Sequence, residues 1–175
     1  MLKSDLRIKH LNIRKNMSVE ERYRFSALIF NRLIQFAKYH EHIGVYISMD
    51  HEVDTRQFIA WCFSLNKKVY VPKIVNKQMI FIEIHSLDEC VINKMGILEP
   101  MANQSTEDTI DLMIVPMLAY NERCYRLGYG KGYYDQYLRQ SNCYPLGICF
   151  SINFEPELFE QEHDVKLAQI FTELN

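Results

Sequence analysis

Residues 126–135 read Arg126-Leu127-Gly128-Tyr129-Gly130-Lys131-Gly132-Tyr133-Tyr134-Asp135, with three of the chain's 6 glycines. The pattern predicts a tight turn from a strand into a helix, because glycine lets a backbone turn sharply and approach a ligand closely. Backbone N–H groups exposed by such a turn can surround phosphate oxygens, and Arg126 before the glycines and Lys131 among them can add charge. A bare turn that binds nothing explains the spacing equally well.

Short apolar runs on both sides of this turn predict the strands of a buried sheet. They cover residues 43–48, 68–74, 79–84, 111–116, 145–150 and 170–172. The second run is expected to stop at Pro72, and residues 76–78 form a turn across which the third run can pair with it.

Helical patterns alternate with these runs. Ser18-Val19-Glu20-Glu21 has the form of a capping box and opens a helix over residues 19–39. Asp54-Thr55 can cap a second helix to residue 65, and residues 131–140 form a third. Residues 92–100 are expected to be loop, and residues 101–109 a surface connector. The alternation predicts an α/β fold, a single layered domain over residues 1–175 with a mainly parallel central sheet flanked by helices.

The composition argues against several classes of protein. The formal net charge is −2, so nothing suggests nucleic acid as a partner. No apolar run reaches the ~18 residues that span a bilayer. Five scattered cysteines favour reduced thiols in a cytoplasmic protein over a disulfide framework or a zinc site.

Charged residues in two other segments are candidates for a site. Glu52 follows the first predicted strand, at the edge of an open α/β sheet that usually faces ligands. Asp54 has a capping role and His51 is expected at the surface. Near the N-terminus, Lys3 and Arg7 share one face if the segment is helical. A solvated helix face explains this pair, and so does a pair of cations beside an anionic ligand.

The stretch at 126–135 resembles the Arg-Leu-Gly-x-Gly-x-Gly-Tyr-Tyr-Asp signature of the 5-formyltetrahydrofolate cyclo-ligase family. Four further pieces of the family pattern follow the family's order along the chain. They are the basic start with Lys3 and Arg7, the segment 49–55, Gly96-Ile97-Leu98-Glu99-Pro100, and His163-Asp164. Two positions depart from the pattern: Asn121 stands where the family often has Asp, and Cys124 where it often has Gly. The second change puts a positive-φ turn at this position in doubt.

The resemblance implies ATP- and Mg²⁺-dependent closure of 5-formyltetrahydrofolate to 5,10-methenyltetrahydrofolate, with release of ADP and phosphate. It assigns roles to these residues: ATP binding to Lys3, Ser4, Asp5, Leu6, Arg7, Arg126, Leu127, Gly128, Tyr129, Gly130, Lys131, Gly132, Tyr133, Tyr134 and Asp135; catalysis to Arg126 and Lys131; folate binding to Met49 and Glu52; Mg²⁺ binding to Asp135 and Asp164. The implied partners are ATP and the folate, without nucleic acid or membrane, in a monomer or weak homodimer.

Two other function classes stay open. The departures at Asn121 and Cys124 suggest a nucleotide- or folate-binding module that has lost catalysis. A different phosphate-handling enzyme, such as a sugar-phosphate isomerase on a related α/β scaffold, is the second alternative. It explains the glycine turn but not Glu52 or His163-Asp164.

Overall fold

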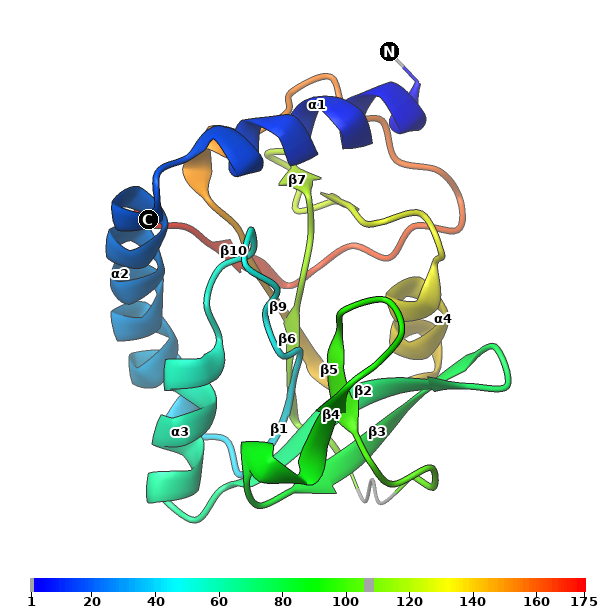
Figure 1. Ribbon diagram of the computed structural model, residues 1–175. Coiled ribbons are helices and arrows are strands. Elements are labelled where there is room, and N and C mark those ends of the chain that lie inside the picture. The colour runs from blue at the N-terminus through cyan, green and yellow to red at the C-terminus, as the bar shows by residue number, and fades with distance from the viewer. Residues whose placement is uncertain (1, 106–108) are drawn as a thin grey trace.

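A six-stranded sheet with the strand order β10-β9-β6-β1-β2-β3 forms the centre of the computed structural model, which describes residues 2–105 and 109–175 (Figure 1). Its strands are β1 (His42–Val45), β2 (Lys68–Val75), β3 (Gln78–Ile84), β6 (Leu112–Val115), β9 (Tyr144–Ile148) and β10 (Gln169–Phe171). All neighbouring pairs are parallel except β2 and β3. The predicted α/β class with a mainly parallel sheet is therefore confirmed.

Helices cover both faces of this sheet. In Figure 1, α2 (Val19–Ala37) and α3 (Arg56–Ser64) lie on one side and α4 (Tyr133–Gln140) on the other. Side chains of β6 alternate between the two layers: Leu112 and Ile114 join the core under α2 and α3, whereas Met113 and Val115 join the core under α4. This is the two-residue period of a strand buried on both faces.

Local signals account for the helix starts. The predicted capping box is confirmed, because Ser18 Oγ accepts from Glu21 N at 3.1 Å and Glu21 Oε2 accepts from Ser18 N at 3.0 Å. The N-cap of α3 is Thr55, whose side chain makes no capping hydrogen bond, and Asp54 Oδ1 instead accepts from Arg56 N at 2.9 Å. The predicted Asp54-Thr55 cap is therefore only partly present.

Two expectations about strands were wrong. Pro72 does not end the second strand but lies inside β2, opposite Phe81 of β3. The pairing of β1 with β2 ends at Tyr70, so Pro72 sits where β2 has one strand partner and its missing N–H is tolerated. Residues 92–100 are not loop throughout, because β4 (Cys90–Ile92) pairs with β5 (Leu98–Pro100) around a turn at Gly96, which has φ +77°.

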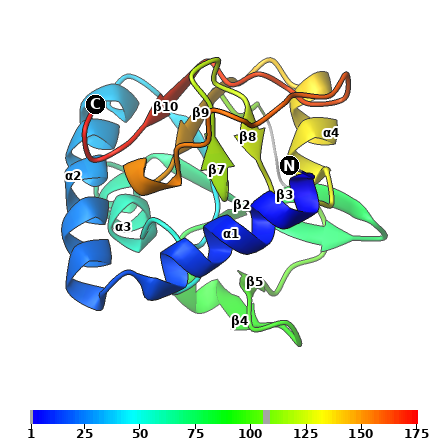
Figure 2. The same cartoon turned by 90° about the horizontal axis from the view of Figure 1, so that it is seen from above.

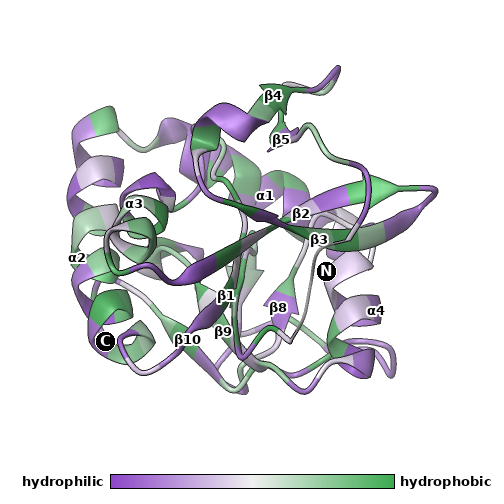
Figure 3. Cartoon of the chain, turned by 90° about the horizontal axis from the view of Figure 1, so that it is seen from below, coloured by the Kyte–Doolittle hydropathy of each residue, from purple (hydrophilic) through white to green (hydrophobic). Residues whose placement is uncertain are grey.

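The remaining elements are short. They are the 3-10 turns Leu87–Glu89 and Ser151–Asn153 and the two-residue strands β7 (Ala119–Tyr120) and β8 (Arg126–Leu127), which pair with each other. Residues 101–105 and 109 of the predicted connector are exposed, and residues 106–108 lie outside the described part of the chain. Along β2 and β3, hydrophobic and hydrophilic stretches alternate (Figure 3). None of the described helices is long and apolar enough to cross a membrane.

The helix α1 (Lys3–Asn16) lies across one end of the sheet rather than on either face (Figures 1 and 2). This is the end at which β1, β6 and β9 finish. The chain leaves β1 towards β2 on one side, and β6 pairs with β1 on the other side. Ligands of open α/β sheets bind at such a switch point, outside the carboxyl ends of the strands.

Candidate functional site

Residues 128–132 form the loop that joins β8 to α4, and we call them the glycine loop. Gly130 has φ +99°, and Gly132 has φ +69° at the N-cap of α4, a region that favours glycine. No backbone N–H from Gly128 to Gly132 donates to any residue that the structure describes. The first N–H groups of α4 also lack helical acceptors by geometry. The loop therefore offers a run of free amide donors, which is the requirement for a phosphate cradle.

Two basic residues of α1 contact segments of the predicted site: Arg7 contacts this loop, and Lys3 contacts Asp164. Arg7 Nε donates to Gly128 O at 2.9 Å, and a Cβ built on Gly130 would lie 3.1 Å from Arg7 Cζ, so the guanidinium packs on the loop. Lys3 Nζ is 2.5 Å from Asp164 Oδ2. Both basic side chains are half-buried, so the solvated-face explanation of this pair was wrong. Their spacing of four residues places both on the inward face of α1.

A buried polar network anchors α1 over the sheet, and the sequence reading did not find it. His10 Nε2 lies 2.9 Å from Glu155 Oε2, which also accepts from Lys9 Nζ at 2.6 Å. Asn153 Nδ2 lies 3.1 Å from His10 Nδ1, and Arg14 donates to Asn153 Oδ1 and to the carbonyl of Met117. These contacts join residues more than 100 positions apart, so no local pattern signals them.

The hydrogen bonds of this network set the protonation states of His10 and Glu155. Asn153 donates to Nδ1, so His10 is a neutral imidazole that donates from Nε2 to Glu155. Burial lowers the pKa of His10, and the neighbouring carboxylate only partly opposes this. Burial alone would raise the pKa of Glu155, but the Lys9 and His10 hydrogen bonds outweigh it and lower the pKa to about 2.

Asp135 and Asp164 lie on neighbouring segments, because Asp135 accepts a hydrogen bond from the backbone of Val165, the residue after Asp164. Asp135 Oδ1 accepts from Arg126 Nη2 at 2.8 Å and from Val165 N at 2.9 Å, while Arg126 Nη1 donates to Val165 O at 2.9 Å. The buried Arg126 guanidinium thus binds the carboxylate of the same motif. Asp164 Oδ2 accepts from Lys3 and from Gln161 N at 2.7 Å. Burial opposes ionisation of Asp164, yet these donors lower its pKa.

The two carboxylates fit a magnesium ion that arrives with phosphates. Asp135 Oδ2 accepts from no described residue, and Asp164 Oδ1 has only His163 Nε2 nearby, at 3.9 Å. Within the described ranges, no group of three or more His, Cys, Asp or Glu side chains could hold a metal. Mg²⁺ commonly takes one or two carboxylates and fills its other positions with water and substrate phosphate oxygens.

Glu52 is buried at the same end of the sheet, where the sequence placed it. Its Oε2 accepts from Met49 N at 2.9 Å, and its Oε1 accepts from Tyr129 Oη of the glycine loop at 2.7 Å. His51 is half-buried rather than a plain surface residue, and its Nε2 lies 3.4 Å from the same hydroxyl. Burial and the Glu52 charge raise the pKa of Tyr129, so its hydroxyl remains a donor.

The two departures from the family signature have structural roles. Asn121 is buried; its Nδ2 donates to Leu158 O at 3.0 Å, and its Oδ1 accepts from Arg123 N and Tyr125 N. Cys124 has φ +63°, so the doubted positive-φ turn is present despite the Cβ.

The other predicted ATP-site residues differ in exposure. Ser4, Asp5 and Lys131 are exposed, Tyr133 and Tyr134 are half-buried, and Leu6 and Leu127 are buried together in a small apolar cluster.

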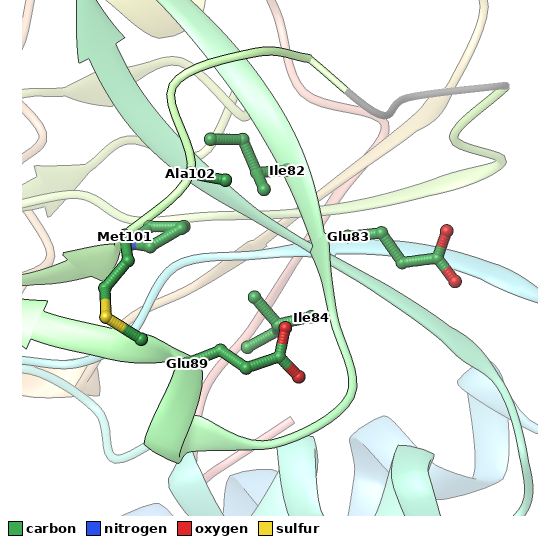
Figure 4. A pocket seen from close by; sticks show the side chains of 7 residues that line it. Ile82, Glu83, Ile84, Glu89, Met101 and Ala102 are labelled. Atoms are coloured by element: carbon green, nitrogen blue, oxygen red, sulfur yellow. The ribbon is translucent and has the colours of Figure 1, made fainter.

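A cavity of about 140 Å³ lies elsewhere, between β3, Glu89 and residues 100–102. Figure 4 shows Ile82 and Ile84 on the side of β3 that faces Met101, with Glu83 on the opposite side. None of the predicted site residues lines this cavity, so it is not the candidate site.

Comparisons with known proteins agree with one another. A model described as the 5-formyltetrahydrofolate cyclo-ligase family matches residues 1–173. The 5-formyltetrahydrofolate cyclo-ligase of Mus musculus is 27% identical over 175 residues, which cover 90% of this chain and 86% of the mouse protein. A probable 5-formyltetrahydrofolate cyclo-ligase of Schizosaccharomyces pombe is 30% identical over 152 residues, 75% of this chain and 74% of the yeast protein. The NMR structure of Aquifex aeolicus 5,10-methenyltetrahydrofolate synthetase has a TM-score of 0.87 at 29% identity, covering 100% of this chain and 91% of that chain.

Proposed function

The chain belongs to the 5-formyltetrahydrofolate cyclo-ligase family, and on that premise we propose how its site closes the folate ring with ATP and Mg²⁺. It is a ligase that acts on folate in one-carbon metabolism. In the proposed reaction the formyl oxygen of 5-formyltetrahydrofolate attacks the γ-phosphorus of ATP and ADP leaves. The N10 amine then attacks the activated formyl carbon and loses its proton. Departure of phosphate completes 5,10-methenyltetrahydrofolate.

The observation that carries this proposal is the run of free amides from Gly128 to Gly132. Phosphoryl transfer needs alignment and charge neutralisation more than a protein nucleophile. We assign the triphosphate to these amides, with Arg7 packed on the loop and Lys131 exposed on it as countercharges. Arg126 acts here through Asp135, whose carboxylate it orients at 2.8 Å.

Asp135 and Asp164 are the proposed protein ligands of Mg²⁺. The bound ion would neutralise charge on the phosphates during transfer. Asp135 is already ion-paired to Arg126 and Asp164 to Lys3, so both carboxylates are held in place. Lys3 therefore positions a metal ligand in addition to its proposed nucleotide contact.

Glu52 is the proposed receptor for the pterin ring, whose amino and ring N–H groups are donors that suit a carboxylate. Met49 supports it through its backbone N–H at 2.9 Å and is half-buried beside it. The contact between Tyr129 and Glu52 joins the glycine loop to this carboxylate, so the proposed ATP and folate subsites are adjacent.

Turnover of the purified protein tests this function. With 5-formyltetrahydrofolate, ATP and Mg²⁺, absorbance of the methenyl product should rise in step with ADP and phosphate release, and chelation of Mg²⁺ should stop it. Asp135→Asn should lower turnover by at least about tenfold, since a charged metal ligand is lost. Asp88→Asn, at an exposed aspartate of the Leu87–Glu89 turn, is the matched control. Binding of both ligands without turnover would instead favour a non-catalytic module.

A further inference from the structure

We infer that the Tyr129 hydroxyl occupies, in the free protein, the oxygen of Glu52 that the folate must take, so that folate binding releases the glycine loop. The inference rests on the proposed role of Glu52 as the pterin receptor. Its geometric basis is the 2.7 Å hydrogen bond from Tyr129 Oη to Glu52 Oε1, between residues 77 positions apart.

Only one of the two Glu52 oxygens can be released easily. Oε2 accepts from Met49 N within a turn that Glu52 N closes on Met49 O at 2.9 Å, so this bond is part of the local backbone fold. Oε1 is bound to a side chain on a different segment. A ligand that donates to the carboxylate therefore competes with Tyr129 for Oε1 and leaves the Met49 bond intact.

Tyr129 can leave without disturbing a core. The residue is 40% exposed, and none of the three apolar clusters includes it. Besides its bond to Glu52, its hydroxyl lies 3.4 Å from His51 Nε2, and the two rings are 6.4 Å apart centroid to centroid. The charges of Arg14 and Glu52 also act on this hydroxyl. Glycines flank it on both sides, and Gly130 already has a positive φ. Release thus costs mainly one hydrogen bond to a charged acceptor.

This competition couples the two subsites. The apparent affinity for folate is reduced by the fraction of molecules in which Tyr129 holds Oε1. The same bond ties the loop that carries the free amides to Glu52, so folate binding changes the freedom of that loop. By linkage, any ligand that favours the released loop favours folate.

The test compares folate binding to the wild-type protein and to Tyr129→Phe, by calorimetry with 5-formyltetrahydrofolate and no nucleotide. Phenylalanine keeps the ring and removes the competing donor, so we expect about tenfold tighter binding, from the usual strength of a hydrogen bond to a charged group. Tyr39→Phe, at a 79% exposed tyrosine after α2, should bind like the wild type. Equal or weaker binding by Tyr129→Phe overturns the inference.

Limited proteolysis supplies a second readout on the same proteins. Folate alone should speed trypsin cleavage after the exposed Lys131 in the wild type, because the hydroxyl anchor of the loop is lost. In Tyr129→Phe this cleavage should be fast before folate is added. Slowed or unchanged cleavage in the wild type also counts against the inference. If the wild type binds no folate, the proposed function fails together with it, whereas equal binding by both proteins removes only the role of Tyr129.

Discussion

Glu155→Gln is the change that should best separate the anchoring of α1 from the chemistry of the site. The Glu155 carboxylate is 3% exposed and binds Lys9 and His10, both on α1. Its pKa is about 2, against an ordinary value of 4.5. This difference between folded and unfolded states corresponds to roughly 3 kcal/mol of stability at pH 7. Glutamine keeps the shape and an acceptor but removes the charge, so most of this contribution should be lost.

The dependence on pH has a definite sign. The folded pKa of Glu155 is depressed, so its contribution is fully present above pH 4.5 and disappears as pH falls towards 2. The stability difference between wild type and Glu155→Gln should therefore be largest at neutral pH and shrink across that window. Urea unfolding, followed by fluorescence of Trp61, the single tryptophan, measures it at each pH.

Glu157→Gln is the matched control. Glu157 is exposed and two residues away, so its neutralisation should change the free energy of unfolding by less than about 0.5 kcal/mol. Because Glu155 holds the helix that carries Lys3 and Arg7, Glu155→Gln should also raise the KM for ATP. A Glu155→Gln protein as stable as wild type at pH 7, or a difference that stays constant down to pH 2, would refute this account of the anchor.

Two further changes test the loop and the helix that follows it. Gly130→Ala should raise the KM for ATP at least about tenfold, because φ +99° is strained for alanine and its Cβ would press on the Arg7 guanidinium. Asn66→Ala, at an exposed residue with φ +56° outside the site, should stay near wild type in the same steady-state assay; equal effects would contradict the role of the loop in ATP binding. Tyr134→Phe should raise the melting temperature, because the buried Tyr134 hydroxyl has no hydrogen-bond partner among the described residues. A calorimetric scan that shows a lower melting temperature would mean that this hydroxyl is satisfied in solution.

Much of the layout follows from signals that act over a few residues. The capping box at Ser18 and Glu21 closes within one turn, and it placed the start of α2 at the observed residue. The turn at Asn76 and Lys77 has positive φ at both residues, as the two-residue connection of β2 to β3 requires. Apolar runs located the six sheet strands within a few residues, because a strand buried on both faces is apolar at every position.

Errors arose where the outcome depended on neighbours in space. Proline lacks the backbone N–H that a paired strand uses, so Pro72 predicted the end of a strand. β2 nevertheless continues past it, because β1 stops pairing with β2 at Tyr70. The basic pair on α1 suggested a solvated face, because a sequence cannot show that Arg7 packs on a loop 121 residues away. Asp135 could be named as a carboxylate of the motif, but not its pairing with the buried Arg126.

The glycine loop shows both what local sequence determines and what depends on distant segments. Its positive φ angles and free amides are local consequences of Gly130 and Gly132, so residue types at 126–135 were enough to predict a loop able to hold phosphate. The contacts that complete the site join Lys3 to Asp164 and Tyr129 to Glu52, across 161 and 77 residues. Only the packed sheet brings these segments together, because the parallel strands end at one edge and α1 is anchored across it.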